Sequence, residues 1–164
     1  MSNSQKARVP RILLIERDAA VRELLNEVLV DANYRVLVDE HPLDPAQVSN
    51  VQPDLIVLNV PIEAASPELD FVSHVKSEVL TTHIPILALC RSKPTEEFSA
   101  WAHQKGIAGL LLKPFDVDVF VETVQAILDA SKLPATRADL PVPSVHHLNR
   151  GTDDPSAQSS PAPR

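Results

Sequence analysis

Several short apolar runs in this 164-residue chain end at side chains that could do chemistry. These side chains are Glu16, Arg17, Asn59, Cys90 and Lys113. Carboxylate and amide oxygens are ligands for hard cations, and a thiol becomes a nucleophile when it ionises. The arginine and the lysine supply positive charge that can pair with a carboxylate or an anion. Because these residues are far apart in the sequence, they form one site only if the runs are neighbouring strands.

Other catalytic and metal-binding patterns are missing from the sequence. Cys90 is the single cysteine, so neither an internal disulfide nor a thiolate metal cage can form. The six histidines give no Ser-His-Asp or Cys-His constellation. The residues after the first apolar run read ERDAA, which is no glycine-rich loop for a nucleotide or flavin phosphate. We therefore expect no enzyme activity, no metal and no cofactor.

The elements that must position these side chains alternate along the chain. Strands are predicted at 11–15, 34–38, 54–59, 84–89 and 110–112. A helix follows the first strand, and further helices are predicted at 45–51, 67–79, 94–105 and 116–130. Since each strand is apolar on both faces, the fold class is α/β: a three-layer, doubly wound, five-stranded parallel sheet. The working site of such a sheet lies at the carboxyl ends of its strands.

Periodicity also assigns inward faces to the helices. Leu24 belongs to the apolar stripe of the first helix, and Val79 to that of the helix at 67–79. Asp18 is placed to begin the first helix, and Gly106 to end the helix at 94–105.

Charge and proline divide the chain into segments. Residues 134–164 hold six of the fifteen prolines, no aromatic residue and no net charge, so the rest carries the whole charge of −7. We expect a flexible N-terminus at 1–8, one folded domain at 9–131 and a disordered tail at 132–164, too short for an output domain. The acidic balance argues against nucleic-acid binding. No apolar run approaches a membrane span and no secretory signal is visible, so we expect a cytoplasmic protein.

Four segments together resemble the receiver domain of two-component response regulators across about residues 9–131. They are ILLIERDAAVRELL, PDLIVLNVP, IPILALC and GLLLKPF, and the KPF at 113–115 is the most specific. The resemblance implies a flavodoxin-like (βα)5 fold with strand order 2-1-3-4-5. The resemblance implies that strand 1 ends in two acids that hold Mg²⁺, where this chain has Glu16 and Arg17. It implies a phosphoacceptor Asp at the position of Asn59 and a Ser or Thr at that of Cys90. An aromatic is implied at Leu110, while Lys113 is kept, with a cis bond to Pro114.

Several roles of these residues stay open. Arg17 either replaces the cation, by pairing with Glu16, Glu63 or a backbone carbonyl, or is an exposed arginine without a role. Lys113 is expected to turn toward Glu16 or Asn59. Cys90 is either a thiol with a pKa lowered by nearby cations or inert filling of the core. Trp101, Leu110 and Phe115 are candidates for an interface, because receivers bind partners through helix 4, strand 5 and helix 5 and aromatics are enriched in binding hot spots.

These departures favour a pseudo-receiver: a phosphorylation-independent signalling module that binds a histidine kinase, a regulator or a scaffold. Homodimerisation through the same face is a further alternative. One rival is a response regulator phosphorylated on an unusual acid such as Glu63 or Glu16. The other is a small-molecule-binding, flavodoxin-like protein or enzyme.

Overall fold

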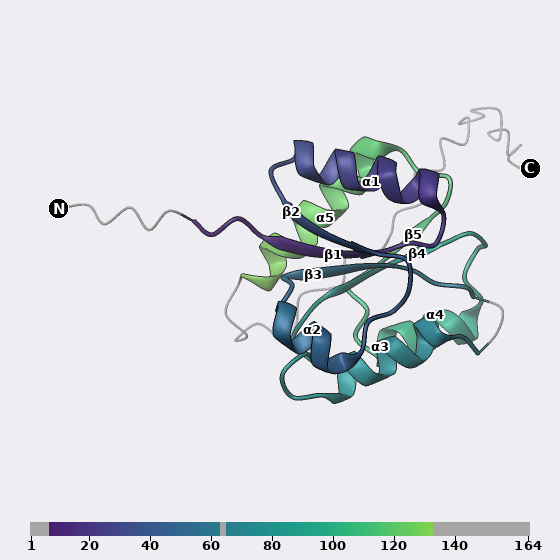
Figure 1. Cartoon of the computed structure of the whole chain (residues 1–164). Coiled ribbons are helices and arrows are strands. Elements are labelled where there is room, and N and C mark those ends of the chain that lie inside the picture. The colour runs from purple at the N-terminus through teal and green to yellow at the C-terminus, as the bar shows by residue number, and fades with distance from the viewer. Residues whose placement is uncertain (1–6, 63–64, 133–164) are drawn as a thin grey trace, which may run out of the picture.

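A computed structural model of the protein describes residues 7–62 and 65–132 (Figure 1). Along this part the elements run β1 (Arg11–Ile15), α1 (Ala19–Asp31), β2 (Arg35–Asp39), α2 (Pro45–Val51), β3 (Leu55–Asn59), α3 (Pro67–Ser77), β4 (Ile86–Cys90), α4 (Glu96–Gln104), β5 (Gly109–Leu112) and α5 (Val117–Ser131). The strands are parallel in the order β2-β1-β3-β4-β5. In Figure 1, α1 and α5 cover one face of the sheet and α2, α3 and α4 cover the other. The predicted three-layer fold is confirmed.

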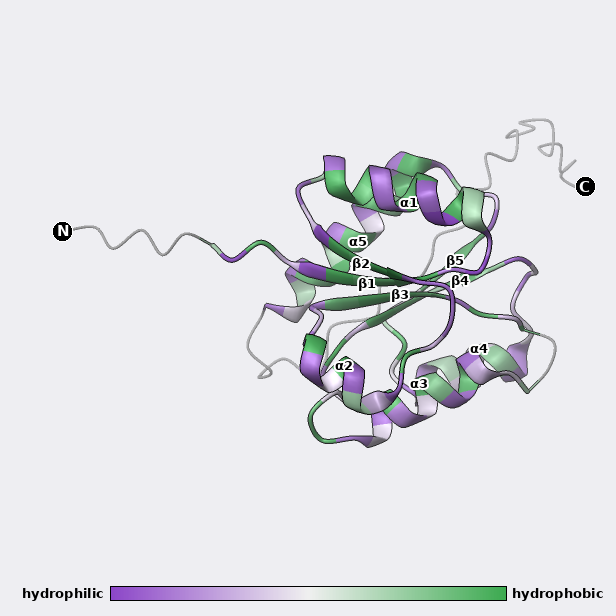
Figure 2. Ribbon diagram, viewed as in Figure 1, coloured by the Kyte–Doolittle hydropathy of each residue, from purple (hydrophilic) through white to green (hydrophobic). Residues whose placement is uncertain are grey.

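The core consists of two apolar layers, one on each face of the sheet. Successive side chains of a strand point to opposite faces, so Leu13 packs toward α3 and α4 while Leu14 packs toward α1 and α5. Apolar residues therefore run almost continuously along the strands, whereas the helices alternate apolar and polar residues (Figure 2). Because the strands are buried on both faces, their register in the sheet is set by packing, and the register sets where the strand ends lie.

Side-chain caps set where the helices begin. The Asp18 carboxylate accepts a hydrogen bond from the Val21 N–H at 3.1 Å, as the sequence predicts for the start of α1. That bond lowers the pKa of Asp18, because the N–H stabilises the ionised carboxylate. Asp44 forms a capping box with Gln47 at the start of α2. Gly106 follows α4 with φ of +69°, which confirms its predicted role after the helix.

Three packing predictions are wrong. Val79 is 85% exposed, because α3 ends at Ser77 and the chain turns away before that residue. Leu24 is 49% exposed, at the margin of the apolar face of α1. The edge strand β2 is not covered on both faces: Leu37 and Val38 remain 41% and 42% exposed, since no strand or second helix of the described residues extends the layers beyond it.

The predicted segments 1–8 and 132–164 lie largely outside the described residues. Residues 7 and 8 are the described part of the N-terminal segment, and Arg8 donates hydrogen bonds of 3.0 and 2.9 Å to the two carboxylate oxygens of Asp54. Among the helices of the described part, none has the length and apolar character needed to span a membrane.

Candidate functional site

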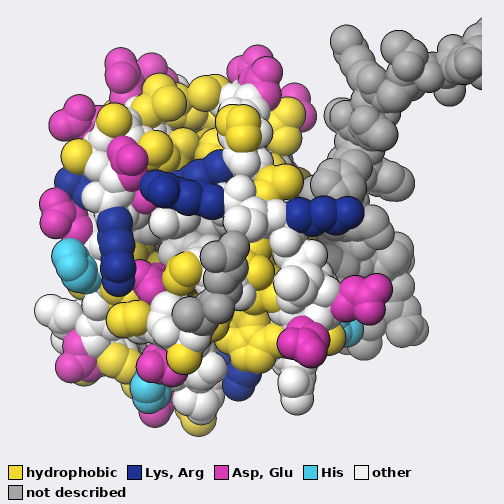
Figure 3. Space-filling view, turned by 90° about the vertical axis from the view of Figure 1, so that its right-hand side faces the viewer, with side chains coloured by type: hydrophobic (Ala, Val, Ile, Leu, Met, Phe, Trp, Pro, Cys, Tyr) yellow, Lys and Arg dark blue, Asp and Glu magenta, His cyan; other side chains and the backbone are white. Residues whose placement is uncertain are grey.

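The strand ends bring the five predicted site residues to one end of the sheet. Glu16 and Arg17 follow β1, Asn59 and Cys90 end β3 and β4, and Lys113 follows β5. Figure 3 looks onto this end of the molecule, where Lys and Arg side chains lie around the middle and more Asp and Glu side chains lie toward the margins. Positive and negative groups are therefore close enough to pair.

Lys113 connects the strand ends. Its Nζ lies 2.5 Å from Oε2 of Glu16 and donates a hydrogen bond of 3.3 Å to Oδ1 of Asn59. Both predicted contacts of Lys113 are confirmed, and its bond to Pro114 is cis as the resemblance implies. The Glu16 side chain is fully buried, and its second oxygen accepts the backbone N–H of Asp18 at 3.0 Å. Among these five residues Glu16 is the one carboxylate, and it is already paired and hydrogen-bonded.

Arg17 pairs with a residue that sequence reasoning missed. Its Nη2 lies 2.7 Å from Oε1 of Glu68, a side chain only 5% exposed in the first turn of α3. Within the described residues Arg17 pairs with neither Glu16 nor a backbone carbonyl, and Glu63 lies outside them. The acidic start of α3 was a visible signal, but its distance from Arg17 depends on the path of the loop after β3.

Two further arginines lie at this end of the sheet, and neither was singled out in the sequence. Arg22 Nη1 donates to the backbone oxygens of Glu16 at 2.8 Å and Arg17 at 3.1 Å. Arg91 approaches Asp18 at only 3.9 Å, and both side chains are substantially exposed. Arg22 therefore holds the turn after β1, whereas Arg91 forms a long, solvated contact.

A shallow cavity of about 360 Å³ opens beside this cluster. Arg17, Asn59, Glu68, Arg91 and Ser92 supply its polar lining. Within the described residues, no three His, Cys, Asp or Glu side chains come together as a metal site. Mg²⁺ requires several oxygen ligands, usually including one or two carboxylates. The residues present do not fit Mg²⁺, since Glu16 is held by Lys113 and Glu68 by Arg17.

Cys90 belongs to the core. Its side chain is buried in the layer toward α3 and α4, and burial raises the pKa of its thiol to about 11 despite an opposing effect of Lys113. The hypothesis of a pKa lowered by nearby cations is wrong, because the cost of desolvating a thiolate exceeds their attraction. The geometry favours the alternative, an inert core thiol.

The three candidate interface residues are half-buried and do not share one layer. Trp101 and Leu110 pack against the layer of Cys90, and the Trp101 ring lies 5.5 Å from that of Phe98. Phe115 packs in the opposite layer, with its ring 5.5 Å from the ring of Phe120. Their role in binding stays a prediction.

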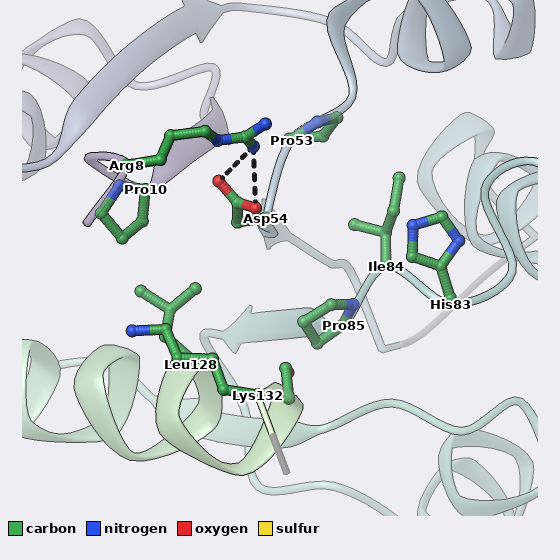
Figure 4. A pocket seen from close by; sticks show the side chains of 10 residues that line it. Arg8, Pro10, Pro53, Asp54, His83, Ile84, Pro85, Leu128 and Lys132 are labelled. Carbon is green, nitrogen blue, oxygen red and sulfur yellow. Dashed lines mark hydrogen bonds and ion pairs between the residues drawn. The ribbon is translucent and has the colours of Figure 1, made fainter. Parts of the chain in front are cut away.

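A second cavity, of about 390 Å³, lies at the opposite end of the sheet (Figure 4). The Arg8–Asp54 ion pair forms one wall, with Pro53 beside it, and Ile84, His83 and Leu128 lie across the opening. It contains none of the five strand-end residues, and no sequence pattern indicated it. We assign it no chemistry.

No family model matches the chain, but relatives and solved structures do. The phosphate regulon transcriptional regulatory protein PhoB of Escherichia coli is 28% identical over 119 residues, which cover 72% of this chain and 51% of PhoB. The chain thus spans about half the length of that relative.

Solved structures of response regulators share the fold. A response regulator protein from Burkholderia multivorans superposes with a TM-score of 0.61 and 26% identity, covering 78% of this chain and 99% of that one. The chemotaxis response regulator CheY4 of Vibrio cholerae gives a TM-score of 0.64 at 22% identity, over 73% of this chain and 99% of that one. Together these likenesses show a CheY-like fold and a sequence similar to that of response regulators.

Proposed function

We propose that this chain is a pseudo-receiver: a signalling module that acts by binding another protein and does not take a phosphoryl group. The observation that carries the proposal is Asn59 at the end of β3, with its Oδ1 held by Lys113. The resemblance to receivers implies an Asp at this position. A carboxylate can attack a phosphoryl donor, whereas an amide is neutral and a poor nucleophile, so no acyl phosphate forms there.

The charges around Asn59 support the same proposal. Arg17 places a permanent cation beside the position that resemblance assigns to Mg²⁺. Two unit charges of one sign about 4 Å apart repel by roughly 4 kcal/mol at an effective dielectric constant near 20. Glu16 and Glu68 already pair with Lys113 and Arg17, so neither of these two carboxylates is free to bind a metal.

Protein binding is the mode of action that remains for such a domain. The proposed partner is a histidine kinase, another regulator or a scaffold, and the proposed surface includes Trp101 and Leu110. Both are half-buried and supported from below by the core, so they could lose their remaining exposure to a partner without rearrangement.

The test is incubation of the full chain with acetyl phosphate and Mg²⁺, followed by intact-mass measurement. We expect no phosphoryl adduct. Glu16→Gln and Glu63→Gln serve as matched variants for the rival in which an unusual acid is modified. An adduct on the wild type that one of these variants removes would overturn the proposal and establish that rival.

A further inference from the structure

The outer edge of β2 is an open hydrogen-bonding edge. On its inner side the N–H of Arg35 donates to Pro10 and the carbonyl of Asp39 accepts from Glu16, so the odd-numbered residues pair with β1. Since successive residues of a strand present their N–H and C=O groups to opposite sides, those of Val36 and Val38 point outward. β2 is the last strand of the sheet on this side, so no further strand of the described chain satisfies them.

The side chains of this edge are also available. Leu37 and Val38 are 41% and 42% exposed, on opposite faces of the strand. Most exposed edge strands are protected by an inward charge, a proline or a bulge, and β2 has an apolar centre without any of these. Arg35 is exposed and forms no ion pair with any other described residue. The strand therefore presents both backbone and side-chain groups to a partner.

The sequence of β2 is complementary to itself when reversed. It reads Arg35-Val36-Leu37-Val38-Asp39, with opposite charges at the ends, valines inside them and a leucine at the centre. We propose that β2 pairs antiparallel with β2 of a second copy, about a twofold axis at Leu37, to give one continuous sheet. Arg35 then faces Asp39 of the second copy, Val36 faces Val38, and Leu37 faces Leu37.

The outward backbone groups fit this register. In an antiparallel pair, opposed residues alternate between those that exchange both hydrogen bonds and those that exchange none. With Leu37 opposite Leu37, the outward groups of Val36 meet those of Val38, and Leu37 falls at a non-bonded position. A shift by two residues also joins outward groups, but it places Arg35 or Asp39 opposite a leucine and removes both ion pairs. Charge complementarity therefore selects one register.

The proposal is independent of whether the strand ends take phosphate. It uses a strand edge separate from Trp101, Leu110 and Phe115, so a dimer of this kind leaves the proposed partner surface free. The pairing is short, which predicts a weak dimer that forms with increasing protein concentration.

Cysteine cross-linking tests the register. The full-chain L37C and V38C proteins are oxidised with diamide, and disulfide-linked dimer is measured on a non-reducing gel. Cα atoms of the Leu37 pair would lie about 4.5 Å apart, within the range of a disulfide, whereas two Val38 positions are offset by two residues and lie beyond about 7 Å. The two sites are equally exposed and the native Cys90 is buried, so V38C is a matched control. We expect dimer from L37C and not from V38C, and equal yields would overturn the register.

Charge reversal tests the pairing without a covalent bond. Analytical ultracentrifugation across a concentration series should show loss of dimer for R35D and for D39R, because each places like charges opposite each other. An equimolar mixture of the two should recover the dimer, since it restores both ion pairs across the interface. Far-ultraviolet circular dichroism checks that each variant is folded. A monomeric wild type, or dimerisation unaffected by R35D, would refute the proposal.

Discussion

The carboxyl ends of the strands and the outer edge of β2 handle charge in opposite ways. At the strand ends, Lys113 and Arg17 contact the buried carboxylates Glu16 and Glu68. At the β2 edge, Arg35 has no ion-pair partner among the described residues, and the outward backbone groups of Val36 and Val38 meet no strand. Lys113 and Arg17 at the strand ends are paired within one chain, whereas the edge of β2 still has backbone groups that could bind a further strand.

Because of this difference, ion binding at the strand ends and association through β2 must be considered separately. A receiver fold draws attention to the strand ends, but there the ionic groups of this chain already pair with one another. A site with its charges compensated internally gains little from an added ion, while an open strand edge gains hydrogen bonds from any matching strand. We therefore expect substitutions at the strand ends to change stability strongly, and substitutions at β2 to change association with little effect on stability.

The largest effect is expected from Lys113→Met. It leaves the Glu16 carboxylate buried without its cation, and breaking one side of a buried pair costs about 3 kcal/mol. Urea unfolding followed by circular dichroism measures the loss. The double variant Glu16→Gln with Lys113→Met is the control, because it removes both charges and should recover part of the loss. A single variant as stable as the wild type would show that the pair is not essential to the strand ends.

A smaller effect is expected from Arg17→Gln. It leaves the Glu68 carboxylate poorly compensated, and an unsatisfied buried acceptor costs about 1–3 kcal/mol, here toward the lower end because half of the Arg17 side chain is exposed. Arg91→Gln is the matched control: its 3.9 Å contact with Asp18 is solvated, so its loss should be near zero. Thermal unfolding compares the two. Equal losses would mean that Arg17 is an ordinary surface arginine.

The stability difference between the wild type and Cys90→Ala should depend on pH. Burial raises the pKa of the Cys90 thiol from 9.0 to about 11. Between these two pH values the thiol stays protonated in the folded protein and ionises in the unfolded chain. Relative to Cys90→Ala, the wild type should therefore keep its full advantage below pH 9 and lose part of it between pH 9 and 11. Urea unfolding at several pH values measures this difference. A difference that stays constant across that window would indicate a solvated thiol.

The smallest change in stability is expected at Leu37. Leu37→Thr in dilute protein, where the chain is monomeric, should alter the free energy of unfolding by less than about 0.5 kcal/mol, because the side chain is substantially exposed. At high concentration the same variant should associate less than the wild type. A loss of stability as large as that of Lys113→Met would place Leu37 in the core and contradict the description of the edge.

The sequence predicts the strands and helices, because each repeats an apolar pattern. It does not predict side-chain contacts that depend on tertiary geometry. Alternating apolar runs predict five strands, and the parallel ends that follow from them bring Lys113 to Glu16 and Asn59. The Arg17–Glu68 pair depends on the loop after β3, which no periodicity describes. The exposure of Leu37 depends on which strand is outermost, a property of the whole sheet.

The central claim is that internal charge pairing, as well as the missing acid, keeps the strand ends from phosphoryl chemistry. Intact-mass measurement after acetyl phosphate and Mg²⁺ tests it on two variants, Asn59→Asp alone and Asn59→Asp combined with Arg17→Asp. We expect no adduct on the single variant, because Arg17 remains, and a phosphoryl adduct on the double variant. An adduct of equal yield on Asn59→Asp alone would contradict it.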